Sequence, residues 1–562
     1  MEENINLNDK KRKVSKGNFK VKRLLIILFG IIVVGILSVS IGMEYIIFDK
    51  NESINLVINN KNVTGNLKQD ILIKDDIIYL SVADISNFFD NNIYLEKDID
   101  KVVTTYRKKI VEIGFDSNTM EVNGSNVKID GCAILDNEEI FLPISEMNNV
   151  YEIESKYTED TKVVTLDSTF KAQDKATVVK SSSIKSTTKF ISKTIDRIGK
   201  GEEVVVISTG ENYAMVRTKN GKIGYIKKSK LGEIENVRLD MEEEKQIEEN
   251  INMVWDYYSE VADAPIRKEK IKGVNVISPA FFHLDNKGEI IENGSEEYVE
   301  LAKENGYKVW PMISNAGTGM IDVTSDILND YSKRKELIKN IFSACIKSNV
   351  DGINVDFENM YEKDKDVFSR FIIELTPIMK EAGLVVSVDV TAPDGGETWS
   401  MCYDRNRLGK VADYIVFMAY DEYGEFSEKA GTTSGYDWIE LSLNKFLKTE
   451  EIPSNKIILG LPFYTRLWTV SEDGKVIKTS TVSIKYVDKV ISENVEKKWL
   501  EEEKQYYVEY IEEGNTKKMW IEDKKSLEEK LNLVKTNKLA GAAFWAKDME
   551  YSSIWNMINE KL

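Results

Sequence analysis

One short apolar stretch of the sequence carries two carboxylates and an amide at alternate positions. Residues 351–358 read DGINVDFE, which places Asn354, Asp356 and Glu358 two residues apart. Successive side chains of a β-strand point to opposite faces, so these three share one face of a strand. Neighbouring carboxyl groups in a buried site repel each other's charge, and one of them therefore keeps its proton. Such a pair supplies the acid half of glycoside hydrolysis.

The order along the strand predicts how the two carboxyl groups divide the work. Glu358 lies nearer the C-terminal end of the strand and any ligand, and we expect it to hold the proton as general acid. Asp356 is expected to stay charged or to share a proton with its neighbours. The structural alternative, a solvated strand face, would need an exposed sheet edge. Two buried carboxyls cost free energy unless they are paired or used, which favours a functional site.

The elements that must position these residues are parallel βα units. From about residue 238 to 562, apolar strand-like runs alternate with amphipathic helical stretches. Seven strands are visible, beginning at residues 274, 308, 352, 384, 413, 457 and 540. The third is followed by DVFSRFIIELTPIMKEAG, whose apolar residues recur at helical spacing. This pattern predicts an α/β fold, a (β/α)8 TIM barrel with catalytic groups at the C-terminal strand ends.

These residues also carry a family resemblance. DGINVDFE matches the DGxxxDxE signature of glycoside hydrolase family 18, the chitinase-like barrels, and MAYDEYG at residues 418–424 looks like the family's M-x-Y-D strand. AFWAKD places Trp545 where the last strand of the family supplies an aromatic floor. The similarity spans about residues 275–562 and is greatest to bacterial wall- and spore-associated members.

The resemblance implies a retaining, substrate-assisted mechanism without a protein nucleophile or a cofactor. Glu358 would protonate the leaving oxygen while the 2-acetamido group of the sugar attacks the anomeric carbon, and would later act as base for the water. Asp356 would orient the acetamido nitrogen and Tyr420 its carbonyl oxygen. Trp545 would stack under the sugar, and Met418 is a further binding candidate from the same motif as Tyr420.

One position departs from the family pattern. Many chitinases carry Asp where this sequence has Asn354, so a proton that such an Asp shares with Asp356 is missing. An Asn amide can still donate a hydrogen bond to Asp356, but it does not titrate. We expect activity to be retained with an altered acid limb of the pH profile.

Three other residues are candidates for the substrate site. His283 ends a strand, where it either faces the site or serves as a structural donor. Trp310 and Asp421 either line the sugar site or serve core packing and pairing at the barrel rim. A strand-rich insertion over about residues 469–522 is expected to form one wall of the site.

The N-terminal segment predicts a membrane anchor. Residues 24–43 are uncharged and long enough to span the hydrocarbon core as a helix. Residues 1–23 hold eight Lys and Arg against three acids and should stay cytoplasmic, which sends the rest of the chain outside. A cleaved signal peptide is the alternative, but its apolar region would be shorter.

Two small modules are expected between the anchor and the barrel. Residues 51–168 repeat themselves, with IIYLSVADI answered by EIFLPISEM, and resemble the α+β module known as the N-terminal domain of copper amine oxidases. We interpret it as a spacer, or else as a wall-interaction module. Residues 176–232 contain alternating strands and a Lys-Asn-Gly hairpin signal, and they resemble a small all-β bacterial SH3-like domain.

The composition excludes several function classes. A single His cannot build a multi-His zinc site, and the three Cys lack a CxxC spacing, so no metal site is expected. The net charge of -18 argues against nucleic acid as a partner. The sequence therefore predicts an extracytoplasmic glycosidase that cleaves β-1,4 bonds of N-acetylglucosamine-containing polysaccharide, first peptidoglycan and otherwise chitin-type oligosaccharides. The competing hypotheses are a non-catalytic chitin- or peptidoglycan-binding lectin on the same barrel and a scaffold for wall assembly.

Overall fold

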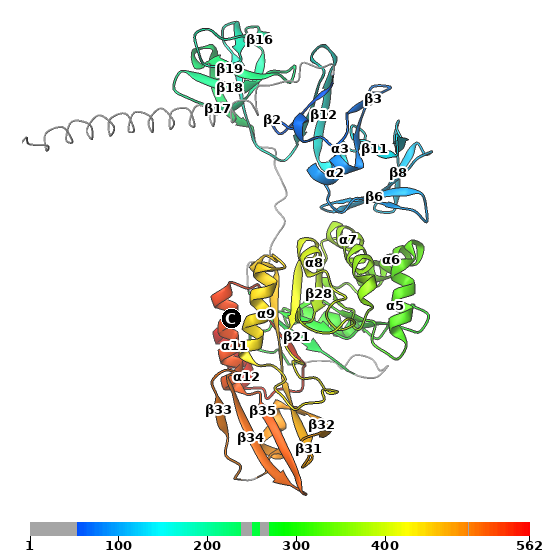
Figure 1. The fold of residues 1–562 in the computed structure, drawn as a ribbon, viewed down its shortest axis with the longest axis vertical. Helices are drawn as coiled ribbons and strands as arrows, with labels where there is room; N and C mark the ends of the chain where they lie inside the picture. The colour runs from blue at the N-terminus through cyan, green and yellow to red at the C-terminus, as the bar shows by residue number, and fades with distance from the viewer. Residues whose placement is uncertain (1–52, 238–249, 259–268, 493) are drawn as a thin grey trace, which may run out of the picture. The chain divides into compact units, whose positions relative to one another are not determined.

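The computed structural model describes residues 53–237, 250–258, 269–492 and 494–562 (Figure 1). These residues form two compact units. One consists of most of the chain before residue 238, and the other contains Tyr94–Glu112, Glu121–Ser125 and the described residues from Asn250 onward. The expected membrane anchor at residues 24–43 lies outside the described residues. Among the residues that are described, there is no helix with the length and apolarity needed to cross a membrane.

The second unit is built on a closed barrel of parallel strands. Its eight positions are occupied by β21 (Ile251–Asp256), β22 and β23 (Val276–Pro279, Phe282–Leu284), β25 and β26 (Lys308–Val309, Met312–Ser314), β27 (Gly352–Asp356), β28 (Val385–Val390), β29 (Tyr414–Met418), β30 (Ile457–Pro462) and β36 (Gly541–Trp545). β36 pairs with both β30 and β21, which closes the sheet. β21 is an eighth strand that the sequence pattern did not indicate, and the strand beginning near Val274 is therefore the second of the barrel.

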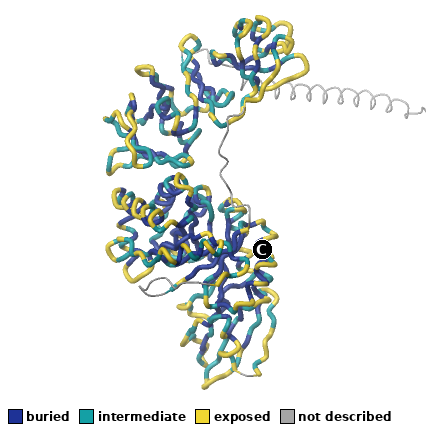
Figure 2. Tube along the Cα trace, turned by 180° about the vertical axis from the view of Figure 1, so that it is seen from behind, coloured by how far each residue is buried: buried dark blue, intermediate teal, exposed yellow. Residues whose placement is uncertain are grey.

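Amphipathic helices cover the outer face of the barrel. They are α4 (Glu296–Glu304), α5 (Met320–Asn329), α6 (Tyr331–Lys347), α7 (Lys365–Glu381), α8 (Arg405–Val411), α9 (Tyr436–Lys448), α11 (Lys524–Asn537) and α12 (Ile554–Lys561). Buried segments lie between the helices and the sheet, while the outer helix faces are exposed (Figure 2). α7 is the helix expected after the third visible strand, and it buries Phe368, Phe371 and Leu375.

The alternation along β27 is as the sequence predicted. Ile353, Val355 and Phe357 are fully buried in the cluster between sheet and helices. Asn354 and Asp356 therefore point to the opposite face, into the barrel. The inside of the barrel is otherwise filled by a second, separate apolar cluster that includes Trp255, Met312 and Met418.

An antiparallel sheet interrupts the barrel before its last helix and strand. It consists of β31 (Tyr464–Val470), β32 (Val476–Ser483), β33 (Lys498–Leu500), β34 (Gln505–Glu512) and β35 (Asn515–Ile521), in the order β32-β31-β35-β34-β33. This is the strand-rich insertion expected near residues 469–522. An ion pair between Lys530 of α11 and Glu522, both fully buried, lies where the insertion rejoins the barrel.

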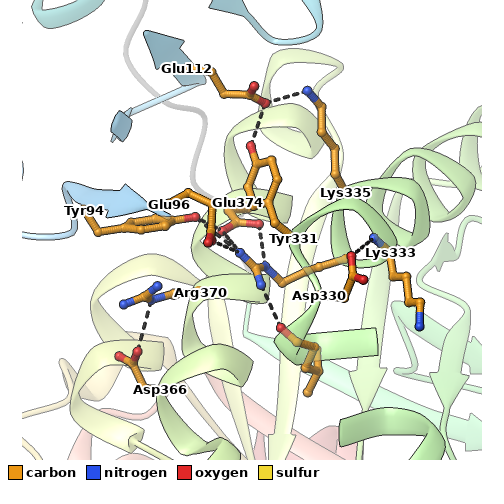
Figure 3. Close-up of polar contacts among 12 residues, drawn as sticks. Tyr94, Glu96, Glu112, Asp330, Tyr331, Lys333, Lys335, Asp366, Arg370 and Glu374 are labelled. Atoms are coloured by element: carbon orange, nitrogen blue, oxygen red, sulfur yellow. Dashed lines mark hydrogen bonds and ion pairs between the residues drawn. The ribbon is translucent and has the colours of Figure 1, made fainter. Parts of the chain in front are cut away.

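Strands from the early part of the chain also belong to the second unit. Tyr94 and Glu96 of β5 (Tyr94–Glu96) and Glu112 of β7 (Lys109–Gly114) bond to residues of α6 and α7 (Figure 3). β6 (Lys101–Tyr106) also contacts α7. Arg334 of α6 is 1% exposed and pairs with Glu374 of α7 at 2.9 Å and with Glu96 at 3.3 Å. The Tyr94 hydroxyl donates to Glu374.

The first unit contains a pair of repeated elements. The first sequence copy holds β4 (Ile77–Ser81) and the start of α2 (Val82–Phe88). The second copy holds β11 (Glu139–Pro143) and is followed directly by α3 (Asn148–Tyr151). The two strands pair antiparallel with each other, Leu80 opposite Leu142. The two repeated strands therefore share one sheet, of order β10-β11-β4-β3, in which β10 is Ile134–Asp136 and β3 is Leu72–Lys74.

An all-β segment of this unit follows the repeat. Its strands are β14 (Gln173–Val178), β15 (Ser182–Lys185), β16 (Thr194–Ile198), β17 (Glu203–Thr209), β18 (Tyr213–Arg217), β19 (Ile223–Lys227) and β20 (Leu231–Val237). They form one sheet of order β16-β15-β19-β18-β17-β14-β20. A small apolar cluster around Val178, Val216 and Ile226 forms its core.

Candidate active site

The two carboxyl groups of the motif lie at the C-terminal end of β27. Asp356 is the last residue of the strand and is 7% exposed, and Glu358 follows two residues later. A hydrogen bond joins the two carboxyl groups. Burial, then the charges of Asp356 and Asp421, raise the pKa of Glu358 well above its usual range. Burial and the charge of Asp389 raise that of Asp356, so this cluster retains protons that exposed carboxyls would lose.

The backbone of Glu358 is fixed by a side chain that sequence reasoning missed. Asn315, which follows β26, accepts a hydrogen bond from the Glu358 N–H at 2.8 Å and donates one to the Glu358 carbonyl at 2.9 Å. Its second amide hydrogen goes to Thr324 Oγ1 of α5, at 3.1 Å. Asn315 is 3% exposed, so this clamp is part of the protein interior.

Asn354 makes a full set of hydrogen bonds, but none of them goes to Asp356. Its Oδ1 accepts from Trp255 Nε1 at 2.9 Å and from Ser278 Oγ at 3.3 Å. Its Nδ2 donates to Asp389 Oδ1 at 2.6 Å and to Ser387 Oγ at 3.0 Å. The expectation that Asn354 donates to Asp356 is wrong, because both amide hydrogens are directed to the neighbouring strand β28.

That strand brings a third carboxyl group into the barrel. Asp389 is 1% exposed and lies on the same face of β28 as Ser387. Burial raises the pKa of Asp389 well above its usual range, against the lowering effect of the hydrogen bond from Asn354. The sequence contained the signal, because the alternation in VVSVDV places Ser387 and Asp389 on the inward face.

Aromatic rings surround the strand ends. Trp545, at the end of β36, lies edge-on to Trp255 with ring centroids 5.7 Å apart and next to Tyr257 at 5.1 Å. Tyr420 lies edge-on to Trp255 and to Tyr464, at 6.4 and 6.2 Å. Tyr257 is 47% exposed, so its ring is available to a ligand. Trp255 and Tyr257 belong to the strand and strand end that sequence reasoning missed.

Asp421 pairs with neighbouring residues at the rim of the barrel, which is one of the two roles expected for it. Its Oδ1 accepts from Arg466 Nη2 and from the Tyr464 hydroxyl, both at 2.7 Å. Arg466 and Tyr464 belong to β31 of the insertion. The inserted sheet is thus tied to the residue that follows Tyr420, at the strand end where the candidate catalytic groups lie.

The remaining candidates occupy different depths in the barrel. Trp310 is fully buried and stacks on Tyr414 at 5.5 Å, which corrects the sugar-binding interpretation in favour of core packing. Met418 is 4% exposed inside the barrel beside this core. His283 pairs in register with Ser314 and so shares its inward face, and its Nδ1 lies 3.4 Å from Asn293 Nδ2.

Comparison with known proteins assigns the chain to a family. The profile of glycosyl hydrolases family 18 matches residues 253–550, more than half of the chain. The chain belongs to this family of glycosidases. The profile of the copper amine oxidase N-terminal domain matches residues 57–166, in agreement with the resemblance noted for the repeated segment.

The similar proteins include bacterial spore-associated glycosylases and chitinases. The uncharacterized glycosylase YvbX of Bacillus subtilis is 28% identical over 317 residues, which cover 51% of this chain and 84% of that protein. The cortical fragment-lytic enzyme of the same organism is 24% identical over 244 residues, covering 42% and 55%. The crystal structure of the Bacillus megaterium spore cortex-lytic enzyme SleL is 20% identical, with coverages of 65% and 89% and a TM-score of 0.49.

Proposed function

We propose that this protein hydrolyses β-1,4 glycosidic bonds of N-acetylglucosamine-containing glycans, with peptidoglycan as its substrate. The observation that supports this most directly is the hydrogen-bonded pair Asp356 and Glu358 at the end of β27, where burial keeps a proton available for a leaving oxygen. The cortical fragment-lytic enzyme among the relatives supports peptidoglycan as the glycan.

In this mechanism Glu358 donates its proton to the glycosidic oxygen. The acetamido oxygen of the substrate attacks the anomeric carbon, and Asp356 accepts the acetamido N–H, which orients that group. Glu358, now charged, then takes a proton from the incoming water. Two displacements at one carbon retain its configuration. Tyr420 and Trp545 surround the same space and would hold the sugar.

Product analysis tests this function. The full-length chain in detergent is incubated with purified peptidoglycan and with N-acetylglucosamine oligomers, and products are identified by mass spectrometry and NMR. We expect new reducing-end N-acetylglucosamine from peptidoglycan, first as the β-anomer, and a loss of at least about 1,000-fold in Glu358→Gln. Glu336→Gln, the same change on an exposed residue of α6, is the matched control.

The other outcomes lead to other assignments. Cleavage of the oligomers alone would make the protein a chitinase-type enzyme, and an initial α-anomer would contradict retention. If neither substrate is cleaved and both bind, the barrel is a glycan-binding lectin.

We also propose that the protein is anchored in the cell membrane by residues 24–43, with the barrel outside. The uncharged segment and the preceding basic cluster support this. The seven-stranded sheet and small core of the module near residues 176–232 support an SH3-like domain that contacts the wall. Digestion of intact protoplasts by external protease should remove the barrel, and its protection would contradict this orientation.

A further inference from the structure

We propose that Asp389 is a positioning residue that partners Asp356 and holds the proton that Asn354 cannot hold. The inference rests on the proposed hydrolysis, and it assigns a role to a carboxyl group outside the motif of β27. In this arrangement the titrating partner of Asp356 comes from the neighbouring strand, and Asn354 is the fixed amide that connects the two strands.

The strand register brings the two carboxyl groups together. Asn354 lies opposite Ser387 and Val355 opposite Val388 in the parallel pairing of β27 with β28. Continuing this register by one residue places Asp356 opposite Asp389. Side chains opposite each other on one face of adjacent strands are neighbours, roughly 5 Å apart at Cβ.

The hydrogen bonds of Asn354 fix which atoms of Asp389 are available. Trp255 and Ser278 donate to the Asn354 carbonyl, so its amide group must point at β28. The amide donates to Oδ1 of Asp389 at 2.6 Å, which makes that oxygen an acceptor. Trp255 is a further hydrogen-bond donor to this carboxyl group. Oδ2 is the oxygen that the Asn354 amide leaves for a proton.

Asp356 offers the matching acceptor. Its Oδ1 is buried and has no hydrogen-bond partner among the described residues. A buried carboxylate oxygen without a partner is costly, and a proton held by Asp389 would satisfy it. Asn354 is not available for this task, because both of its amide hydrogens are used on β28.

The charges around the pair require such a proton. Glu358 of the same chain segment is the third carboxyl group of this space. Tyr420 after β29, Tyr464 at the start of β31, and Cys402 and Tyr403 before α8 are further titratable groups that interact electrostatically with these carboxyls. The cation of β31, Arg466, is paired with Asp421. Three carboxyl groups in one desolvated space do not all ionise, so they titrate as a coupled set.

This proton has a use during the reaction. When Glu358 gives its proton to the leaving oxygen, a second negative charge forms beside Asp356. Movement of the shared proton from Oδ2 of Asp389 to Oδ1 of Asp356 neutralises the nearer carboxylate and leaves the charge on Asp389, where Asn354 stabilises it. The proton returns when Glu358 is reprotonated from water, so one O–H bond breaks and one forms at each stage.

The test compares four variants by their pH profiles of kcat and kcat/KM on N-acetylglucosamine oligomers. Asp389→Asn should lower kcat by about 10- to 100-fold with little change in KM, and should move the acid limb to higher pH because the Asp356 carboxylate loses the hydrogen bond from its protonated neighbour. The exchange variant Asn354→Asp/Asp389→Asn moves the carboxyl group that partners Asp356 from β28 to β27. It should recover kcat to within about 10-fold of wild type. Asn354→Asp alone adds a fourth carboxyl group to this space and should shift the acid limb upward.

Ser387→Ala is the matched control, because it removes another partner of Asn354 that does not titrate. It should keep kcat within about threefold and leave the acid limb in place. If Asp389→Asn keeps the wild-type acid limb, or if its profile matches that of Ser387→Ala, Asp389 is only structural and the inference is overturned.

A second readout needs no activity. A carboxyl group whose pKa is raised by folding stabilises the protein below its unfolded pKa, and this stabilisation is lost as pH rises through the folded value. The melting temperature of the barrel should therefore fall from about pH 4 upward, and less steeply in Asp389→Asn than in wild type. Equal slopes would contradict proton uptake at Asp389. If wild type cleaves no glycan, the proposed function fails while this measurement still decides whether Asp389 holds a proton.

Discussion

Asn315 and Glu358 are joined by two reciprocal hydrogen bonds between the Asn315 amide and the Glu358 backbone, at 2.8 and 2.9 Å. β27 ends at Asp356, so the sheet itself does not hold the backbone of the candidate acid. The position of Glu358 depends on a side chain that follows the preceding strand of the barrel.

Removing this clamp should reduce catalysis more than binding. In Asn315→Ala we expect kcat to fall by about 100-fold with KM changed less than threefold, since a shift of about 1 Å in the acid is enough for such a loss. Steady-state kinetics on oligomers would measure it. Asn444→Ala, which removes an exposed amide of α9 bonded to Glu440, is the control and should be neutral. Wild-type kcat in Asn315→Ala would contradict the clamp.

The alkaline limb of activity should respond to Asp421. Glu358 acts in its protonated form, so activity is present below its raised pKa and is lost as pH rises through it. The charge of Asp421 is one cause of that raised pKa. Asp421→Asn should therefore move the alkaline limb of kcat/KM to lower pH, and Arg466→Gln, which leaves Asp421 uncompensated, should move it to higher pH. If both variants shift the alkaline limb in the same direction, the charges of Asp421 and Arg466 do not control the pKa of Glu358.

Tyr257 should contribute to substrate binding and not to the chemical step. Its ring is 47% exposed and lies 5.1 Å from Trp545. Tyr257→Ala should raise KM by about 5- to 10-fold with kcat nearly unchanged, because loss of one aromatic contact is about 1 kcal/mol. Phe190→Ala removes a fully exposed ring from the other unit and should leave KM on soluble oligomers unchanged. A fall in kcat without a change in KM would contradict a role of Tyr257 in substrate binding.

The ion pair between α6 and α7 should be important for stability. Arg334→Met leaves Glu374, which is 1% exposed, as a buried charge without its cation, at a cost of about 3–5 kcal/mol. Arg334→Met/Glu374→Leu should recover most of this. Urea unfolding followed by tryptophan fluorescence reports on the barrel unit, because all nine Trp lie beyond residue 250.

The control for this prediction is Lys339→Met. Lys339 pairs with Glu336 on the exposed side of the same helix, where both side chains are mostly in solvent. We expect a change below about 0.5 kcal/mol. If both variants change the free energy of unfolding equally, the burial of Arg334 makes no contribution to stability.

The sequence predicted the parts of the site that depend on local alternation. The inward face of β27, the α7 helix and the barrel class all follow from periodicity within one segment. β21 was missed because INMVWD is a short apolar run directly after the acidic stretch EEEKQIEEN, where periodicity does not distinguish a strand from the end of a helix.

Other parts of the site depend on contacts between segments. Asn315 is recognisable only when β26 and β27 are neighbours, and Arg466 only when the insertion contacts Asp421. Asp389 is different, since the alternation rule applied to β27 also applies to VVSVDV. The same rule would have found the third carboxyl group.

Glu358 lies beyond the last hydrogen-bonded residue of β27, and its side chain is no part of the apolar cluster between sheet and helices. In evolutionary terms, the chemistry is therefore separable from the scaffold. A single codon change from Glu to Gln would remove the acid and leave the barrel, the aromatic rings and the Asn315 clamp intact. Catalysis can thus be lost by drift within a lineage while sugar recognition persists.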